Sequence, residues 1–163
     1  METAYFAGGC FWCITPTFRM TEGVAGVTSG YSGGEEANPV YEDVKLQRTG
    51  HRETLRIEVD PKAVRYETLL TIFLDSVDPF AGGGQFIDGG LSYTLAVYWC
   101  SETQRQAAEA AVARLEAAAG RPVMVSIEPF SQFWEAEDYH QNYDLKNPEA
   151  FEEELIVSGR KSR

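Results

Sequence analysis

The chain is poor in cysteine, in histidine and in positive charge. Its 163 residues include three cysteines and two histidines, and 14 basic side chains stand against 25 acidic ones, giving a net charge of −11. Three cysteines do not complete a disulfide framework, which indicates a reducing, cytoplasmic setting. A nucleic acid or an anionic membrane requires a basic surface, so neither is expected as a partner.

Long hydrophobic runs are missing as well. No apolar stretch approaches the length that spans a bilayer, and no basic region followed by an apolar core comes after Met1, so no signal peptide is expected. We find no repeat, low-complexity tract or long linker, and 163 residues fit one domain. Residues 1–163 are therefore expected to form a single domain, with 158–163 as a frayed tail. No exposed apolar helix face calls for a partner, so we expect a monomer.

What the sequence does contain is a pair of thiols three positions apart, in Gly8-Gly9-Cys10-Phe11-Trp12-Cys13. A thiol at the start of a helix lies near the positive end of the helix dipole, which favours the nucleophilic thiolate. The two aromatic side chains could supply an apolar wall for a small substrate group. The C-x-x-C spacing alone fits a catalytic pair, a redox disulfide or a metal site.

The hydrophobic pattern predicts alternating strands and helices. Its order contains the βαββαβ pattern of a ferredoxin-like, two-layer α/β (α+β) plait, interrupted by glycine-rich loops at 32–38 and 81–90 and followed by an irregular C-terminal extension. Pro16 favours a helix that becomes regular near Thr15. The strands are expected at 3–8, 24–30, 54–59, 93–99 and 122–130, and further helices at 66–77, 102–119 and 148–157.

Several polar residues stand directly before strands, where they could handle protons. A carboxyl beside tyrosines and a thiol can serve as a general acid if burial raises its pKa. From spacing alone, however, Glu53 and Asp88 are more often solvated loop acids. By the same reasoning, Tyr41 and Tyr93 are more often half-buried packing residues.

The remaining candidates are two histidines and one cysteine. His51 and His140 could bind zinc together with the two N-terminal thiols, but their separations do not fit a compact zinc pattern. No metal is therefore expected. Cys100 follows an apolar run at the end of a strand and is interpreted as an inert, structural thiol.

Taken together and in chain order, these pieces resemble the A-type peptide methionine sulfoxide reductases, enzymes that reduce the S epimer of methionine sulfoxide. Any one segment is a weak signal, but the set is highly specific and extends over almost the whole chain. The matching segments are Gly9-Cys10-Phe11-Trp12, Gly30-Tyr31-Ser32-Gly33-Gly34, Asn38-Pro39-Val40-Tyr41, Thr49-Gly50-His51 with Glu53, Gln85 with Asp88, Gly90 and Tyr93, Glu137-Asp138-Tyr139-His140-Gln141, and Lys146-Asn147-Pro148.

The resemblance implies a role for each matched site residue. Cys10 matches the nucleophile and Glu53 the acid that protonates the sulfoxide oxygen. Tyr41 and Tyr93 match the hydroxyls that hold this oxygen, and Asp88 matches a carboxylate that supports the network around it. Phe11 and Trp12 match the aromatic box that holds the methyl group of the sulfoxide.

The resemblance also implies how the enzyme is recycled. Many relatives keep a recycling cysteine in a C-terminal tail, whereas this chain resembles the subgroup with a cysteine three residues after the nucleophile. It implies a Cys10 sulfenic acid, then a Cys10–Cys13 disulfide that an external dithiol such as thioredoxin reduces, without bound cofactor. The implied substrates are oxidised proteins, peptides and free methionine sulfoxide, in the repair of oxidative damage. Thr15 replaces a common Glu, and Phe86-Ile87 replaces a commoner Gly-Asn.

Three other functions fit part of the pattern. A general thiol–disulfide oxidoreductase would use the same C-x-x-C and leave Glu53, Tyr41 and Tyr93 without a role. A zinc-binding interaction module would use the thiols with the histidines. A catalytically silent relative would bind oxidised methionine as a sensor.

Overall fold

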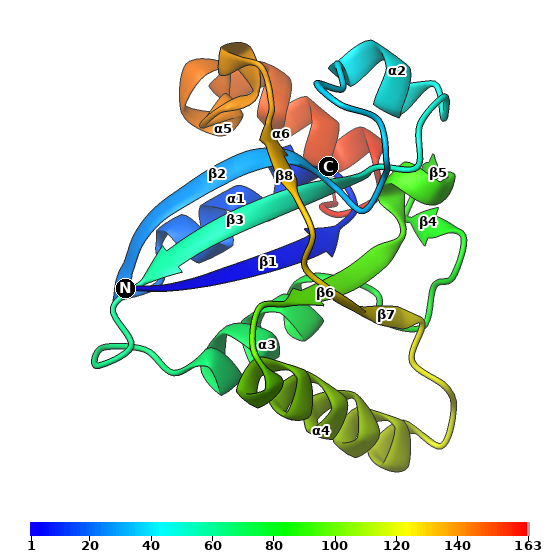
Figure 1. Ribbon diagram of the computed structural model, residues 1–163. Coiled ribbons are helices and arrows are strands. Elements are labelled where there is room, and N and C mark those ends of the chain that lie inside the picture. The colour runs from blue at the N-terminus through cyan, green and yellow to red at the C-terminus, as the bar shows by residue number, and fades with distance from the viewer. Residues whose placement is uncertain (163) are drawn as a thin grey trace.

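A twisted six-stranded sheet forms the centre of the computed structural model, which describes residues 1–162 (Figure 1). Neighbouring strands run antiparallel except β6 and β7, which pair in parallel. The fold is thus of the mixed α/β kind. In spatial order the strands are β7 (Val125–Pro129), β6 (Leu95–Trp99), β1 (Glu2–Gly8), β3 (Arg52–Val59), β2 (Val24–Ser32) and β8 (Phe133–Glu135).

The helices form two groups at opposite ends of the view in Figure 1. One group holds α3 (Tyr66–Ser76) and α4 (Glu102–Ala119), which pack against each other, and the other holds α2 (Tyr41–Lys45), α5 (Tyr143–Lys146) and α6 (Pro148–Val157). Helix α1 (Phe11–Arg19) packs on β2 and β3 and contacts α3, α5 and α6. It therefore links the two groups.

The main core lies between the sheet and the helices α1 and α3. The strands contribute Phe6, Leu55 and Ile57, all fully buried, and the helices contribute Phe18 and Phe73, also fully buried. Burying side chains of this size is typically worth about 1.5–3 kcal/mol each, which makes this layer the main source of stability. A smaller cluster around Tyr98 and the stacked rings of Tyr5 and Phe130 covers the other face of the sheet.

Helix α1 begins at Phe11, earlier than Pro16 had indicated. Cys10 is the N-cap residue, Pro16 lies inside the helix, and the Thr15 hydroxyl donates to the Phe11 carbonyl at 2.6 Å instead of capping. Three apolar side chains on one face, Phe11, Ile14 and Phe18, are buried. Tertiary packing of an amphipathic face commonly outweighs local propensity, so the helix forms despite the proline.

Two helices have the predicted bounds, and several short elements were not predicted. Helices α4 and α6 cover 102–119 and 148–157 as expected, whereas β6 begins at Leu95 because residues 91–93 form a 3₁₀ helix. The loop at 81–90 contains a hairpin of β4 (Gly84–Gln85) and β5 (Asp88–Gly89). The stretch 131–147, expected to be irregular, contains β8, a 3₁₀ helix (Asp138–His140) and α5.

The C-terminal segment is held by contacts as far as the structure describes it. Ser158 is buried, Arg160 forms an ion pair with Asp88, and the Lys161 backbone N–H donates to the Leu155 carbonyl. The expectation that 158–163 frays is therefore wrong for 158–161, because a helix end and an ion pair fix them; residue 163 lies outside the described residues. No helix within 1–162 is long and apolar enough to cross a membrane.

Candidate active site

The Cys10 side chain lies at the junction of β1 and α1, where it borders a cavity of about 270 Å³. Gly9 makes the turn between strand and helix with a φ of +82°, a conformation that side chains other than glycine rarely adopt. The cavity collects six of the eight predicted site residues. Its lining is Cys10, Trp12, Tyr41, Lys45, Glu53, Ile87, Asp88, Tyr93 and Glu154.

Glu53 is a buried acid at the start of β3. Its side chain borders the Cys10 cavity, the residue is 2% exposed, and its Oε1 accepts a hydrogen bond from the Phe11 backbone N–H at 3.1 Å. Burial raises the pKa of this carboxyl well above its usual value, and the nearby Cys10 thiol acts in the same direction. The carboxyl therefore keeps its proton at higher pH than a solvated one. The expectation from spacing alone, a solvated loop acid, is wrong for Glu53.

The resting state of Cys10 differs from the thiolate that a helix start favours. The hydrogen bond with the Cys13 side chain and then burial raise the pKa of the Cys10 thiol well above its usual value. Both effects act against the helix N-terminus, which favours the thiolate. The cavity at rest thus holds a thiol beside a carboxylic acid.

Two tyrosine hydroxyls complete the polar side of the cavity. Tyr41 begins α2, and Tyr93 ends the 3₁₀ helix before β6. Burial first, and the Glu53 charge second, raise the pKa of both hydroxyls above the ordinary tyrosine value. Both side chains therefore stay protonated and can donate hydrogen bonds across the physiological pH range.

The apolar side of the cavity is a rigid group of aromatic rings. The Trp12 ring stacks on Tyr143 with centroids 3.9 Å apart and an interplanar angle of 10°. Its Nε1–H donates to His140 Nδ1 at 2.9 Å. Phe11 is buried and is not among the residues that line the cavity, and its ring centroid lies 5.2 Å from that of His140. The indole is therefore fixed both by stacking and by a directional hydrogen bond.

His140 is a neutral, buried acceptor. Burial lowers its pKa to about 4, and the residue is 1% exposed. Because Nδ1 accepts from Trp12, the proton of the neutral ring is on Nε2. Its position in the sequence gave only a weak zinc-ligand hypothesis, and the structure places it in the aromatic group instead.

Glu137 positions Tyr41 from the irregular C-terminal stretch. One carboxylate oxygen accepts from the Tyr31 hydroxyl and the other from the Tyr41 backbone N–H, both at 2.9 Å. Burial opposes ionisation here, but the hydrogen bonds to the Tyr41 backbone and the Tyr31 hydroxyl outweigh it and lower the pKa of Glu137. The segment 137–141 belongs to the resemblance, which offered no role for this acid.

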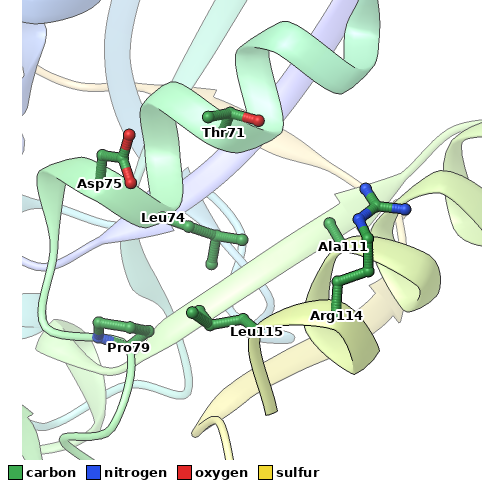
Figure 2. A pocket seen from close by; sticks show the side chains of 7 residues that line it. All are labelled: Thr71, Leu74, Asp75, Pro79, Ala111, Arg114 and Leu115. Carbon is green, nitrogen blue, oxygen red and sulfur yellow. The ribbon is translucent and has the colours of Figure 1, made fainter. Parts of the chain in front are cut away.

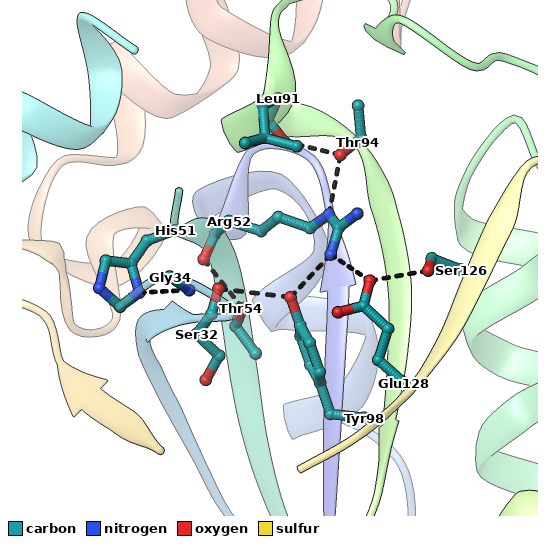
Figure 3. Close-up of polar contacts among 10 residues, drawn as sticks. All are labelled: Ser32, Gly34, His51, Arg52, Thr54, Leu91, Thr94, Tyr98, Ser126 and Glu128. Atoms are coloured by element: carbon teal, nitrogen blue, oxygen red, sulfur yellow. Dashed lines mark hydrogen bonds and ion pairs between the residues drawn. The ribbon is translucent and has the colours of Figure 1, made fainter. Parts of the chain in front are cut away.

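A polar network next to Glu53 anchors the start of β3 (Figure 3). The Arg52 guanidinium donates to Thr94 Oγ1 at 2.8 Å, to the Tyr98 hydroxyl at 3.0 Å and to Glu128 Oε2 at 2.8 Å. Successive side chains of a strand point to opposite faces, so Arg52 fixes one face of β3 while Glu53 reaches the cavity on the other.

His51 has a structural role beside this network. It is fully buried, and its Nδ1 accepts from the Gly34 backbone N–H at 3.2 Å (Figure 3). Its Nε2 lies 2.8 Å from the Glu36 carbonyl. Both ring nitrogens are used, so His51 has no free lone pair for a metal. It holds the glycine-rich loop 33–36 against β3.

A possible metal group in residues 1–162 lies inside the same cavity. Side-chain ligand atoms of Cys10, Asp88 and Glu154 lie within 4.8 Å of one another. Arg160 Nη1, however, already pairs with Asp88 Oδ2 at 3.3 Å. The guanidinium therefore already neutralises the Asp88 carboxylate, whose negative charge a metal cation would need.

The three cysteines fall into two separate places. Cys13 is half-buried in the first turn of α1, and its backbone N–H donates to the Cys10 carbonyl at 3.2 Å. Cys100 is exposed and follows β6, which runs antiparallel to β1 with Tyr98 opposite Tyr5. Cys100 thus lies at the start of β1 and Cys10 at its end, about 20 Å apart for a strand of this length.

A larger hollow between α3 and α4 offers no comparable chemistry (Figure 2). Its volume is about 520 Å³, and it shares no lining residue with the Cys10 cavity. One acid and one base, Asp75 and Arg114, border it together with mostly apolar side chains, and no nucleophile is present among its lining residues.

A buried thiol and a buried carboxyl of raised pKa share one cavity, an arrangement suited to a cysteine-dependent oxidoreductase. The family model described as peptide methionine sulfoxide reductase matches residues 2–163. The chain belongs to this family.

Individual relatives agree with this assignment. A peptide methionine sulfoxide reductase MsrA of Bacillus subtilis is 43% identical over 162 residues, covering 98% of this chain and 91% of the relative. Methionine sulfoxide reductase A of Corynebacterium diphtheriae superposes with a TM-score of 0.82 at 31% identity, covering 90% of this chain and 75% of that one. Reduced Mxr1 from Saccharomyces cerevisiae gives 0.86 at 26% identity, covering 91% and 86%. Mxr1 in complex with Trx2 shares the fold, with a TM-score of 0.57 at 17% identity over 87% and 84%.

Proposed function

We propose that this protein reduces the S epimer of methionine sulfoxide, free or within proteins, to methionine, with Cys10 as the nucleophile. The observation that carries the proposal is the shared cavity of Cys10 and Glu53, in which burial raises the pKa of both groups. A reaction that consumes a thiol and protonates an oxygen needs an acid that still has its proton at neutral pH.

The reduction step uses both of these protons. The Cys10 sulfur attacks the sulfoxide sulfur, Glu53 gives its proton to the oxygen, and the carboxylate takes up the thiol proton. The S–S bond formed by this attack and the S–O bond of the substrate then break as the hydroxyl group moves to the Cys10 sulfur, which leaves a Cys10 sulfenic acid and methionine. The sulfoxide gains the two electrons that the thiol loses, and Glu53 returns to its starting state.

The two tyrosines stabilise the charge that develops on the oxygen. Hydroxyl donors bind an oxygen that becomes more negative more strongly than they bind the ground state, and this difference lowers the barrier. Loss of one preorganised donor typically costs about 3 kcal/mol. Tyr41 and Tyr93 both border the cavity, which supports this role. Asp88, paired with Arg160, supports the surrounding network.

The aromatic group binds the methyl end of the substrate. Trp12 borders the cavity and is fixed by Tyr143 and His140, and the buried Phe11 ring lies against His140 in the same aromatic group. The methyl group leaves water when it contacts these rings, and because the rings are already fixed, no side chain loses conformational entropy on binding. The binding free energy can therefore orient the substrate. The side on which the methyl binds selects the epimer.

Cys13 recycles the nucleophile. Its thiol attacks the Cys10 sulfenic acid, water leaves, and a Cys10–Cys13 disulfide forms. A dithiol such as thioredoxin then reduces this disulfide by exchange and is itself oxidised. The position of Cys13 in the first turn of α1, with its backbone N–H donating to the Cys10 carbonyl at 3.2 Å, supports this pairing. No bound cofactor or metal takes part in the scheme.

We further propose that residues 1–163 act as a single catalytic domain, as a monomer in the cytoplasm, in the repair of oxidised proteins. The strand order β6-β1-β3-β2, antiparallel throughout, with α1 and α3 in the connections supports a ferredoxin-like plait as the core. Of the two glycine-rich loops, the one at 81–90 then borders the site through Ile87 and Asp88.

Turnover of separated sulfoxide epimers with thioredoxin and its reductase tests the proposed function. We expect methionine from the S form of N-acetyl-methionine sulfoxide and none from the R form. A general thiol–disulfide oxidoreductase would instead reduce insulin and leave both epimers unchanged, which would refute the proposal.

A further inference from the structure

The hairpin beside the cavity has an unusual tip. Strands β4 and β5 pair Gly84 with Gly89 and Gln85 with Asp88, which leaves Phe86 and Ile87 as a two-residue turn. Such turns strongly favour glycine, asparagine or aspartate, because their backbone requires positive φ angles. Here the first turn residue is a phenylalanine with a φ of +55°.

Burial within the protein does not explain this strained residue. A bulky side chain is disfavoured in the left-handed region, and Phe86 remains 51% exposed while Ile87 remains 62% exposed. Two large apolar side chains are thus presented to solvent at a backbone position that asparagine and glycine would occupy more easily. Strain that is not offset by packing indicates a function outside the folding of the chain.

The tip is held in place by polar contacts. The buried Gln85 side chain accepts from the Asp78 backbone N–H and donates to the Asp78 carbonyl, both at 2.8 Å. From the C-terminal segment, the Arg160 guanidinium lies 4.6 Å from the centre of the Phe86 ring while it pairs with Asp88. The hairpin and the Phe86 ring are therefore held in place before any ligand arrives, which reduces the entropy lost on binding.

The tip is continuous with the mouth of the Cys10 cavity. Ile87 and Asp88 border that cavity, whereas Phe86 and Asp88 border an adjacent hollow of about 350 Å³. The side chain of an oxidised methionine that enters the cavity brings its own polypeptide across this rim. The flanking residues of that polypeptide then lie next to Phe86 and Ile87.

We propose that Phe86 and Ile87 form a docking surface for the residues that flank an oxidised methionine, and that they favour apolar neighbours. This inference rests on the proposed function and adds the substrate class. Partial burial of one aliphatic side chain supports a preference of about ten-fold in kcat/KM.

The test compares three substrates with dithiothreitol as the reductant. They are the S forms of N-acetyl-methionine sulfoxide, of a pentapeptide with serines around the sulfoxide, and of the same peptide with leucines. We expect the wild-type protein to prefer the leucine peptide over the serine peptide by about ten-fold in kcat/KM. In the variant Phe86→Asn this preference falls to about three-fold or less, and N-acetyl-methionine sulfoxide is reduced at the wild-type rate, because Phe86 borders the adjacent hollow and is not among the residues that line the Cys10 cavity.

The variant is chosen so that folding does not obscure the result. Asparagine suits the positive φ of the first turn position, so the thermal midpoint of Phe86→Asn is expected at or above that of the wild type. Met20→Ser is the matched control, because Met20 is 81% exposed at the end of α1 and borders neither hollow. It should keep the ten-fold preference.

Three results would overturn the inference. The wild type shows no preference between the peptides, Phe86→Asn keeps the full preference, or all three substrates lose rate together in Phe86→Asn. An unchanged preference in Phe86→Asn, combined with a higher KM for thioredoxin in a parallel assay with that reductant, would assign the tip to the reductant instead. Failure of the proposed function itself is distinguishable, because the wild type would then reduce none of the three sulfoxides.

Discussion

Glu53 and Phe11 are joined by a hydrogen bond of 3.1 Å from the Phe11 backbone N–H to the Glu53 carboxyl, across 42 positions of sequence. The bond ties the start of β3 to the first turn of α1. It holds the carboxyl at the position from which it borders the Cys10 cavity. The acid and the nucleophile are therefore positioned by the same contact between a strand and a helix.

Replacement of Glu53 by glutamine should slow the chemical step and leave substrate binding nearly unchanged. Glutamine keeps a side-chain oxygen for the Phe11 N–H but has no proton that it can transfer, so the single-turnover rate should fall by about 10²–10⁴. Rapid-quench measurement of methionine release checks this. Glu58→Gln, an exposed acid of the same strand, is the control; a near-normal rate in Glu53→Gln would remove the acid from the mechanism.

Stability should fall as pH rises above the ordinary carboxyl pKa. The raised pKa of Glu53 means that the folded protein holds a proton that the unfolded chain has released. Its contribution is complete below the unfolded pKa and is lost as pH rises towards the folded pKa, at about 1.4 kcal/mol per pH unit. Urea unfolding of wild type and Glu53→Gln at several pH values measures the difference. If the free energy of unfolding changes equally with pH in the two proteins, Glu53 is not protonated in the folded state.

Replacement of Cys13 by serine should separate reduction from recycling. The variant should release one methionine per protein and then stall with thioredoxin, because the Cys10 sulfenic acid has no neighbouring thiol with which to condense. Cys100→Ser should cycle at the wild-type rate, since Cys100 lies at the other end of β1. Steady-state turnover with thioredoxin measures recycling in both variants. A wild-type turnover rate in Cys13→Ser would disprove the recycling role of Cys13.

His140 should act on substrate binding through Trp12. Asparagine can offer an oxygen close to the position of His140 Nδ1, whereas leucine offers no acceptor for the Trp12 Nε1–H, which is now 2.9 Å from its partner. We expect His140→Leu to raise KM by about ten-fold, because the buried Trp12 donor then has no partner. We expect His140→Asn, which keeps an acceptor, to have a KM close to that of the wild type. A parallel change in Trp12 fluorescence is expected. Equal KM values for the two variants would contradict this positioning role.

The motif around Cys10 could be recognised from the sequence, but the protonation states could not. A C-x-x-C after a glycine pair marks the nucleophile, and the position at the start of a helix argues for a lowered pKa. Burial and the Cys13 hydrogen bond reverse that direction, and both depend on the folded structure. The same holds for Glu53, which spacing alone assigns to solvent.

The elements that sequence reasoning missed are those stabilised by contacts distant in sequence. Residues 131–147 have no hydrophobic periodicity, yet the Gln141 side chain bonds both backbone groups of Ser29, and His140 accepts from Trp12. Arg160 was assigned to a frayed end because a short basic tail is usually solvated. Its partner, Asp88, lies 72 positions away. By contrast, α4 and α6 have local signals and were predicted with their observed bounds.

The most direct measurement of the central claim is the oxidation state of Cys10 after one turnover in Cys13→Ser. The protein is mixed with the S or the R epimer of a sulfoxide peptide, trapped with dimedone and examined by mass spectrometry. The account predicts one adduct on Cys10 for each methionine released from the S epimer, and none from the R epimer or in Cys10→Ser. Methionine released without modification of Cys10, or equal reaction of both epimers, would contradict it.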